Sequence, residues 1–207
     1  MPRINVYIDG FNLFYGSLKR TPYKWLDIAK LCSILLPDDT IQSIKFFTAN
    51  VSARPHDLHL PVRQQIYLRA LKTIPSVSII RGHFLTHSVS MILTGSNPPQ
   101  RVWVDKTEEK GSDVNIAAHL LHDGHKGLFE TAVLISNDSD LAEPVRMVTQ
   151  ELRLPIGILN PHQKNHSKTL QQYATFVKRI RQHHLADSQF PNPMIDSKGT
   201  FHKPEGW

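Results

Sequence analysis

The stretch Ile4-Asn5-Val6-Tyr7-Ile8-Asp9-Gly10 decides how this 207-residue chain begins to fold. Its β-branched and aromatic residues predict a buried strand, and Asp9-Gly10 predicts a tight turn where the strand ends. Beyond it, helix-like and strand-like segments alternate as far as residue 180. Strands that alternate with helices favour a parallel sheet covered on both faces. We therefore expect an α/β fold with a central, mostly parallel sheet and helices on both faces.

The other expected elements follow from their apolar patterns. The run Ala132-Val133-Leu134-Ile135 is typical of a strand with no face open to water. The remaining expected strands are Ile44–Ala49, Val77–Arg81, Pro155–Leu159 and Phe176–Ile180. The expected helices are Leu26–Leu36, Pro61–Leu71, Asp113–His122, Leu141–Leu152 and Lys168–Tyr173.

Two segments depart from this alternation. Residues 84–110 carry alternating apolar residues around a Gly-Ser-Asn-Pro-Pro turn, which predicts an inserted hairpin or lid. Trp103 in this insertion, with Phe84 nearby, could stack on an unpaired base, but packing of the hairpin onto the domain is the favoured interpretation. Residues 187–207 are rich in proline and glycine, so we expect a mobile or loosely docked tail after a single domain over residues 1–186.

Composition narrows the class of protein. The 24 Lys and Arg against 18 Asp and Glu give a net charge of +6, which would attract a polyanion but also suits an ordinary solvated surface. The single cysteine, Cys32, cannot form an internal disulfide. The sequence contains no signal-peptide pattern and no apolar run of the roughly 18 residues that a membrane span requires. We expect a cytoplasmic protein with no membrane contact.

Four aspartates follow strands or open helices where the fold would bring them to one edge of the sheet. Asp9 ends the first strand, Asp113 opens a helix after Lys110-Gly111-Ser112, and Asp138 and Asp140 follow the strand at 132–135. Each one alone is explained by a local turn or a helix N-cap, worth about 1 kcal/mol. Together they indicate a cation, because crowded carboxylates repel each other and a cap needs no charge.

The type of ligand favours a hard divalent ion. Carboxylate oxygens, without cysteine or an obligatory histidine, suit Mg²⁺ or Mn²⁺ better than zinc. Such ions catalyse phosphodiester hydrolysis by generating a nucleophile from bound water and neutralising charge on the phosphate oxygens. Asn12, beyond Asp9, is a neutral candidate for orienting a water or a phosphate oxygen.

Three motifs carry a family resemblance. Ile-Asp-Gly-Phe-Asn at 8–12, Lys-Gly-Ser-Asp-Val-Asn at 110–115 and Ser-Asn-Asp-Ser-Asp-Leu at 136–141 resemble, in this order, those of the bacterial NYN family, a branch of the PIN-like nuclease superfamily. The resemblance runs from about residue 3 to 180. It implies a PIN-like (Rossmannoid) fold and a metal-dependent endoribonuclease, with metal-binding carboxylates at Asp9, Asp113, Asp138 and Asp140 and a supporting role for Asn12.

The sequence departs from the family pattern at two points. The last motif commonly has glycine where this chain has Asn137, a bulkier residue that could narrow the approach of a phosphate. Many relatives also have a glutamate between the first two motifs. Its equivalent cannot be placed by the motifs, but Glu108 and Glu109 lie close to the second one and are candidates.

Basic residues and histidines could serve the substrate or a second metal. Lys110 would meet a phosphate or temper the carboxylates, unless it is a solvated loop lysine. Residues that could track a nucleic-acid backbone are Arg54, Arg63, Arg69, Lys164, His166 and Lys168, although a charged outer face explains each one as well. His119, His122 and His125 have a spacing that could hold a transition metal, but histidines near a helix C-terminus are also favoured by the helix dipole.

Three functional hypotheses follow. The first is a Mg²⁺- or Mn²⁺-dependent nuclease acting on single-stranded or structured RNA. The second is an RNA-binding or regulatory module that kept the fold and has little turnover. Phosphoryl transfer through a phospho-aspartate is the third, and it fits poorly because Phe11 stands where one class of such enzymes needs a second aspartate. A homodimer and an inhibitory protein partner are compatible with the first hypothesis.

Overall fold

The computed structural model describes residues 3–55, 57–162 and 166–207. Seven strands form one sheet in the order β4-β3-β2-β1-β5-β6-β7. All neighbours in it are parallel except β3 and β4, so the expected α/β fold with a mostly parallel sheet is confirmed. The strands are β1 Arg3–Asp9, β2 Thr40–Ala49, β3 Val77–Ile92, β4 Arg101–Lys110, β5 Thr131–Ile135, β6 Ile156–Asn160 and β7 Phe176–Arg179.

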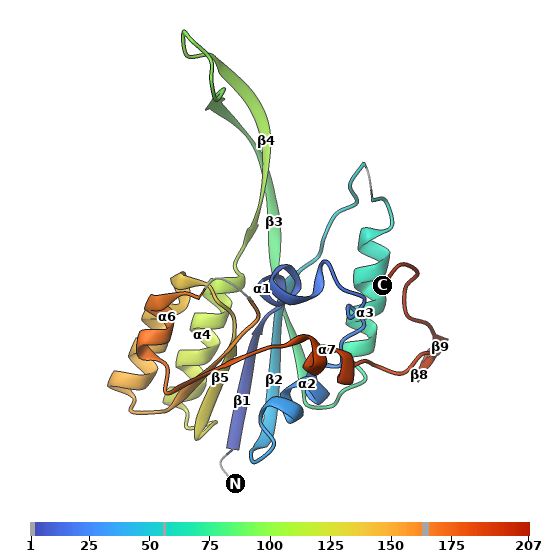
Figure 1. Cartoon of the computed structure of the whole chain (residues 1–207), viewed down its shortest axis with the longest axis vertical. Coiled ribbons are helices and arrows are strands. Elements are labelled where there is room, and N and C mark those ends of the chain that lie inside the picture. Colours follow the sequence, from blue (N-terminus) through green and yellow to red (C-terminus); the bar gives the residue numbers. More distant parts are fainter. Residues whose placement is uncertain (1–2, 56, 163–165) are drawn as a thin grey trace.

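Helices cover both faces of the sheet (Figure 1). One side carries α2 Ile28–Leu35, α3 Leu60–Leu71 and α7 Gln182–Asp187, and the other carries α4 Ser112–His125, α5 Ala142–Arg146 and α6 Lys168–Tyr173. Shorter elements are α1 Gly10–Leu13, the π-helices η1 Phe14–Leu18 and η3 Met147–Glu151, and the 3-10 turn η2 Ser139–Leu141. None of the helices in the described part of the chain is long and apolar enough to cross a membrane.

The alternation of β1 produces two cores. Ile4, Val6 and Ile8 face the cluster that includes α2, α3 and α7, whereas Tyr7 faces the cluster under α4 and α5. The Tyr7 hydroxyl donates a hydrogen bond of 2.6 Å to Asp123 of α4, which satisfies a polar group at the centre of the second core. β1 is the central strand of the sheet, and both of its faces are covered. Its carboxyl end is therefore held firmly in place.

The C-terminal segment is packed, contrary to the expectation of a mobile or loosely docked tail. It forms a small hairpin, β8 Met194–Asp196 and β9 Gly199–Phe201, and buries Phe190 and Phe201 against Trp25 at ring-centroid distances of 5.6 and 6.3 Å. The prolines and glycines shape turns between these few anchors. The expectation failed because three large apolar side chains of the segment, Phe190, Met194 and Phe201, are buried, and they are enough to fix a segment that lacks a periodic pattern.

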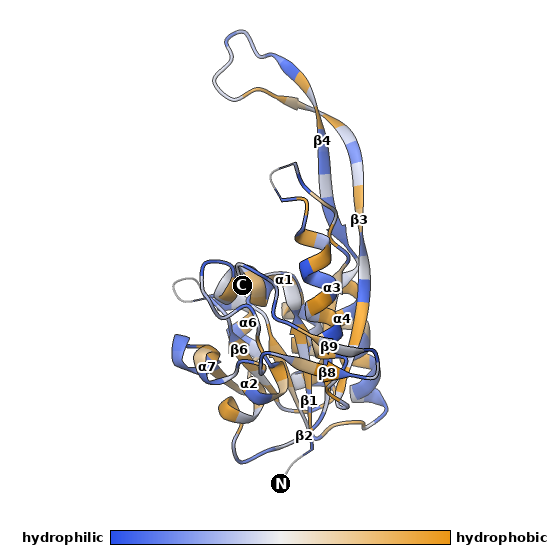
Figure 2. Cartoon of the chain, turned by 90° about the vertical axis from the view of Figure 1, so that its right-hand side faces the viewer, coloured by the Kyte–Doolittle hydropathy of each residue, from blue (hydrophilic) through white to orange (hydrophobic). Residues whose placement is uncertain are grey.

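The inserted hairpin projects from the domain as an arm, defined here as residues 85–108 of β3 and β4 (Figure 1). Trp103 is 76% exposed, so the favoured interpretation, in which this residue packs the hairpin onto the domain, is wrong. One face of the arm is apolar, since Val89 pairs with Val104 and Met91 with Val102, and Figure 2 shows hydrophobic stretches along it. A two-stranded ribbon cannot cover its own apolar face, which is why these side chains remain open.

Candidate metal centre

Three aspartates from distant parts of the chain meet at the carboxyl edge of the sheet. Asp9 ends β1, Asp113 lies in the first turn of α4, and Asp138 follows β5. Each offers a carboxylate oxygen, and these oxygens lie within 4.8 Å of one another. The parallel pairing of β1 with β5 explains the meeting of Asp9 and Asp138, because parallel strands end at the same edge.

Hydrogen bonds hold two of the three carboxylates in place. The Asn12 backbone amide donates to Asp9 Oδ1 at 2.9 Å, and the Ser136 hydroxyl donates to Asp9 Oδ2 at 3.1 Å. The same hydroxyl accepts from the Asp138 amide at 3.1 Å, and Asp138 Oδ1 in turn accepts from the Asp140 amide at 3.1 Å. The residues around β1 and β5 thus fix the geometry before any ligand arrives. The motif after β5 contains Ser136, but its role depends on a contact that the sequence does not reveal.

The electrostatics of the group favour a cation. Burial raises the pKa of Asp9, and the charges of Asp138 and Glu109 add to the rise. The pKa of Asp113 is raised to about 6, first by burial and then by the charges of Asp9, Asp138 and Glu109. A divalent ion would relieve this repulsion, and oxygen donors alone suit Mg²⁺ or Mn²⁺. The donor set therefore fits such an ion.

Glu109 is the fourth acid of the site. Its Oε1 accepts hydrogen bonds from the Ser112 amide and hydroxyl at 3.2 and 2.9 Å, at the start of α4. Glu108 points elsewhere and pairs with Lys106 and Lys110 at 2.6 and 3.1 Å. Alternation along β4 separates the two glutamates, so only Glu109 reaches the aspartates.

Two glycines allow this approach. A Cβ on Gly82 of β3 would meet Glu109 Oε1 and would lie 2.5 Å from the carbonyl oxygen of Lys110, so only glycine leaves room for the crossing of β3 and β4. Gly111 has a φ of +97°, a left-handed conformation that favours glycine and that turns the chain from β4 into α4. The two glycines therefore determine the positions of Glu109 and Asp113 in the site.

A second layer of amides supports the loop after β5. The Asn137 amide donates to Asn12 Oδ1 at 3.0 Å. The side chain of Asn137 turns away, and its Oδ1 accepts from Asn160 Nδ2 at 2.8 Å and from the Ser167 amide at 2.9 Å. The Asn137 side chain thus stabilises the loop after β5, and this contact is a structural reason for the departure from glycine at this position. Through the bond from the Asn137 amide, Asn12 links the first motif to the third.

Three comparisons show which known proteins this chain resembles. The family model described as the NYN domain matches residues 3–180. The chain belongs to the NYN family. It is also 32% identical over 238 aligned positions to 6-hydroxy-3-succinoylpyridine 3-monooxygenase HspA of Pseudomonas putida, an alignment that covers 99% of this chain and 75% of that protein. A crystal structure of a Vibrio parahaemolyticus protein of unknown function has a TM-score of 0.59 at 17% identity and covers 91% of this chain and 96% of that one, which shows the shared fold.

The remaining predicted site residues of this NYN domain lie around the centre or away from it. Asp140 is exposed and stands outside the group of three, although its charge contributes to the raised pKa of Asp113. Lys110 is exposed and pairs with Glu108. Lys164 lies outside the described residues. Within the parts of the chain that are described, the structure gathers carboxylates at metal-ligand spacing in this place alone, so the histidines at 119, 122 and 125 form no such group.

The arginines near α3 have different surroundings. Arg54 is exposed and lines a cavity, and Arg63 lines the same cavity and forms an ion pair with Asp57. Arg69 instead binds Asp196 through two bonds of 2.6 and 2.7 Å and lies over the Phe201 ring. The guanidinium of Arg69 is therefore committed to the C-terminal segment and does not face the site.

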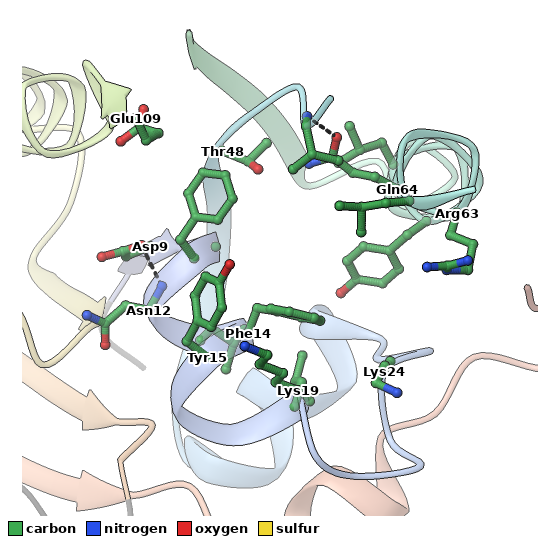
Figure 3. A pocket seen from close by; sticks show the side chains of 18 of the residues that line it. Asp9, Asn12, Phe14, Tyr15, Lys19, Lys24, Thr48, Arg63, Gln64 and Glu109 are labelled. Atoms are coloured by element: carbon green, nitrogen blue, oxygen red, sulfur yellow. Dashed lines mark hydrogen bonds between the residues drawn. The ribbon is translucent and has the colours of Figure 1, made fainter. Parts of the chain in front are cut away.

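A cavity of about 890 Å³ opens beside the metal centre (Figure 3). Asp9, Asp113, Asp138 and Glu109 line one part of it, and aromatic and basic side chains line the rest. Its walls include residues of α1, η1, α3 and β3, and residues 205–207 also line it. A cavity of this size could hold a ligand as large as a nucleotide directly next to the carboxylates.

Proposed function

We propose that this NYN domain is a metal-dependent endoribonuclease that hydrolyses RNA phosphodiester bonds with Mg²⁺ or Mn²⁺. The observation that carries the proposal is the convergence of three carboxylates within 4.8 Å at the carboxyl edge of the sheet. A fold that needed only turns and caps there would have no reason to collect charges that raise one another's pKa. Membership of the NYN family supports a nuclease-type domain.

Each acidic residue has a defined part in this mechanism. The ion would be bound by Asp9 and Asp138. Asp9 is held by Asn12 and Ser136, and Asp138 is held by the Ser136 hydroxyl. Asp113 completes the set from α4, and Asp140 adds negative charge at the rim. A bound divalent ion supplies a water-derived nucleophile and neutralises charge on the phosphate. Asn12 acts as a positioning residue, because its Oδ1 fixes the loop that carries Asp138.

Four basic residues would hold the RNA backbone. We assign this role to Arg54 and Arg63 on the cavity wall, to Lys110 at the end of β4, and to Lys164, which follows β6 in the sequence. Phosphate contacts of this kind position a substrate without reading its sequence. We expect the protein to act in the cytoplasm on single-stranded or structured RNA.

The test is cleavage of labelled RNA and DNA by purified protein with Mn²⁺, Mg²⁺ or a chelator. We expect metal-dependent RNA cleavage that Asp9→Asn and Asp138→Asn abolish. Asp38→Asn is the matched control, because Asp38 is an exposed carboxylate before β2, at the opposite edge of the sheet. If wild type binds RNA but does not cut it with any metal, the RNA-binding or regulatory module replaces the enzyme. If the two aspartate variants cut as fast as wild type, the assigned centre is incorrect.

The name of the Pseudomonas putida relative favours a second candidate, oxidation of a small aromatic acid. The cavity beside the carboxylates has aromatic walls and basic residues, which would suit such a ligand as well as a nucleotide. Monooxygenation consumes O₂ and two electrons from an external reductant. Incubation with a hydroxylated pyridine acid, NADH and Fe²⁺, followed by mass spectrometry, tests this candidate, and a product containing one added oxygen atom would support it over the nuclease.

A protein partner is also proposed. The arm contains Arg101, Lys106, Asp105 and Glu108, so its charges balance and do not favour a polyanion. Its open apolar face suits a protein surface, either the second copy of a homodimer or an inhibitory partner. Light scattering of wild type and of a variant with residues 86–107 replaced by a short turn distinguishes a dimer from a monomer.

A further inference from the structure

The cavity beside the metal centre has two chemically different parts. One part carries the carboxylates of Asp9, Asp113 and Asp138, and the other is walled by aromatic rings. In the view of Figure 3, Phe14 and Tyr15 lie between Asp9 on one side and Arg63 on the other. A centre that only hydrolysed a phosphodiester would need the first part alone. The second part therefore requires its own explanation.

Aromatic rings begin immediately beside the carboxylates. Phe84 of β3 pairs across the hairpin with Glu109 of β4, so its ring stands next to the fourth acid. Phe11, two residues after Asp9, meets Phe84 edge to face with ring centroids 5.7 Å apart. The wall that starts at the metal centre is thus apolar and rigid, because it is built on a strand and on the helix that β1 leads into.

Tyr15 continues this wall and is unusually open. Its side chain is 52% exposed although it lines the cavity, and its ring meets Phe14 edge to face at 5.4 Å. Lys19 Nζ lies 4.8 Å from the centroid of the same ring. An aromatic face next to a cation is the arrangement with which proteins bind unpaired bases and their phosphates.

The cations around the aromatic wall are available to a ligand. Within residues 3–55, 57–162 and 166–207, Lys19 and Lys24 form no ion pair, although both line the cavity. Arg63 is held by Asp57 and would add a third positive group, which is fixed in place. The carboxylate part of the cavity would therefore hold a metal ion and the phosphate bound to it. The aromatic part would hold further negatively charged groups of the ligand.

We infer that the aromatic part of the cavity, lined by Phe11, Phe14, Tyr15 and Phe84, is a subsite for one unstacked nucleobase adjacent to the scissile phosphate. This inference rests on the proposed function. The cavity volume of about 890 Å³ admits a single nucleotide unit. Bases inside a duplex are stacked and paired, so they cannot enter without being extruded. The subsite thus selects single strands and loops, and it does so through stacking more than through base identity.

The experiment scans an RNA oligonucleotide of eight nucleotides with a single abasic residue moved along the strand. Cleavage of one fixed bond is measured with Mn²⁺ for wild type, Tyr15→Ala and Tyr15→Phe. The exposed position of Tyr15 makes both variants compatible with folding, which circular dichroism verifies. Tyr15→Phe keeps the ring and is the matched control.

We expect one abasic position to lower kcat/KM of wild type by about 5- to 150-fold, the range that base–aromatic stacking gives. The loss should be much smaller in Tyr15→Ala and fully retained in Tyr15→Phe. A general loss of activity in Tyr15→Ala, equal on every oligonucleotide, would indicate a structural role and would overturn the subsite. Equal cleavage of all abasic oligonucleotides by wild type would overturn it as well.

A binding measurement separates this inference from the nuclease proposal. Fluorescence anisotropy of the same oligonucleotides is recorded with Asp138→Asn, so the readout does not depend on cleavage. If wild type cuts no RNA but one abasic position still weakens binding in a Tyr15-dependent way, the subsite stands and the nuclease proposal fails. If binding is flat across the scan while a hydroxylated pyridine acid binds and Tyr15→Ala abolishes that binding, the cavity takes a small molecule and the subsite is overturned.

Discussion

Replacing Asp113 by asparagine should make the metal-free protein more stable and abolish the proposed nuclease activity. The Asp113 carboxylate is held by no hydrogen bond in the described parts of the chain, and burial with the charges of Asp9 and Asp138 raises its pKa to about 6. Two unit charges 4.8 Å apart repel by about 3 kcal/mol at an effective dielectric constant of about 20. Because Asp113 is only half-buried, water screens the repulsion, and we expect about 1–2 kcal/mol of relief.

The assay is thermal unfolding with and without Mn²⁺. In a chelator, Asp113→Asn should raise Tm by roughly 2–8 °C, since about 1 kcal/mol corresponds to about 2–4 °C for a domain of this size. Mn²⁺ in excess should raise Tm of wild type, because it binds the folded state alone, and should raise Tm of the variant much less. Asp38→Asn should change neither quantity.

The pH dependence gives a second check on the same variant. A carboxylate with a raised pKa keeps its proton in the folded protein at a pH where the unfolded chain releases it, so metal-free wild type gains stability as pH falls through about 6 towards 4. The Tm advantage of Asp113→Asn should therefore be complete at pH 7.5 and shrink below pH 6. Mn²⁺ must displace the same proton, so its affinity for wild type should fall in that range, by about tenfold per pH unit for one proton.

Two results would refute this reasoning. One is a variant that is less stable than wild type in chelator, which would mean that Asp113 is structural. The other is an equal Mn²⁺ shift in both proteins, which would place the ion elsewhere.

Three further predictions concern the surroundings of the centre. Glu109→Gln should lower the pKa of Asp113, so Mn²⁺ should begin to stabilise the protein at a lower pH. An unchanged pH profile of the Mn²⁺ effect would contradict the role of Glu109 as the fourth acid. Phe201→Ala should cost about 3–5 kcal/mol in urea unfolding, because the ring is 7% exposed and packs on Trp25, and a cost below about 1 kcal/mol would restore the mobile tail. Replacing residues 86–107 by an Asn-Gly turn should leave Tm and the Mn²⁺ shift unchanged, since the arm projects from the domain, and a large loss of Tm would show that the arm supports the fold.

Local sequence determined most of the sheet. The buried runs at residues 4–8 and 132–135 read as strands because strands covered on both faces are nearly continuously apolar, and the structure has β1 Arg3–Asp9 and β5 Thr131–Ile135 there. The helix over Lys168–Tyr173 appears with the expected bounds. The alternation of these elements also predicted the edge at which Asp9, Asp113 and Asp138 would gather, because parallel strands share their carboxyl ends.

Only the tertiary structure decided which neighbours complete the site. Glu108 and Glu109 are adjacent in sequence, and the pleat of β4 together with the space at Gly82 sends one towards the aspartates and the other towards two lysines. Periodicity likewise could not show that Phe190 and Phe201 would dock on Trp25 or that Trp103 would stay in solvent. Such outcomes depend on contacts between residues far apart in the chain. Local pattern fixes elements and their ends, whereas the packing of one element on another fixes which side chains meet.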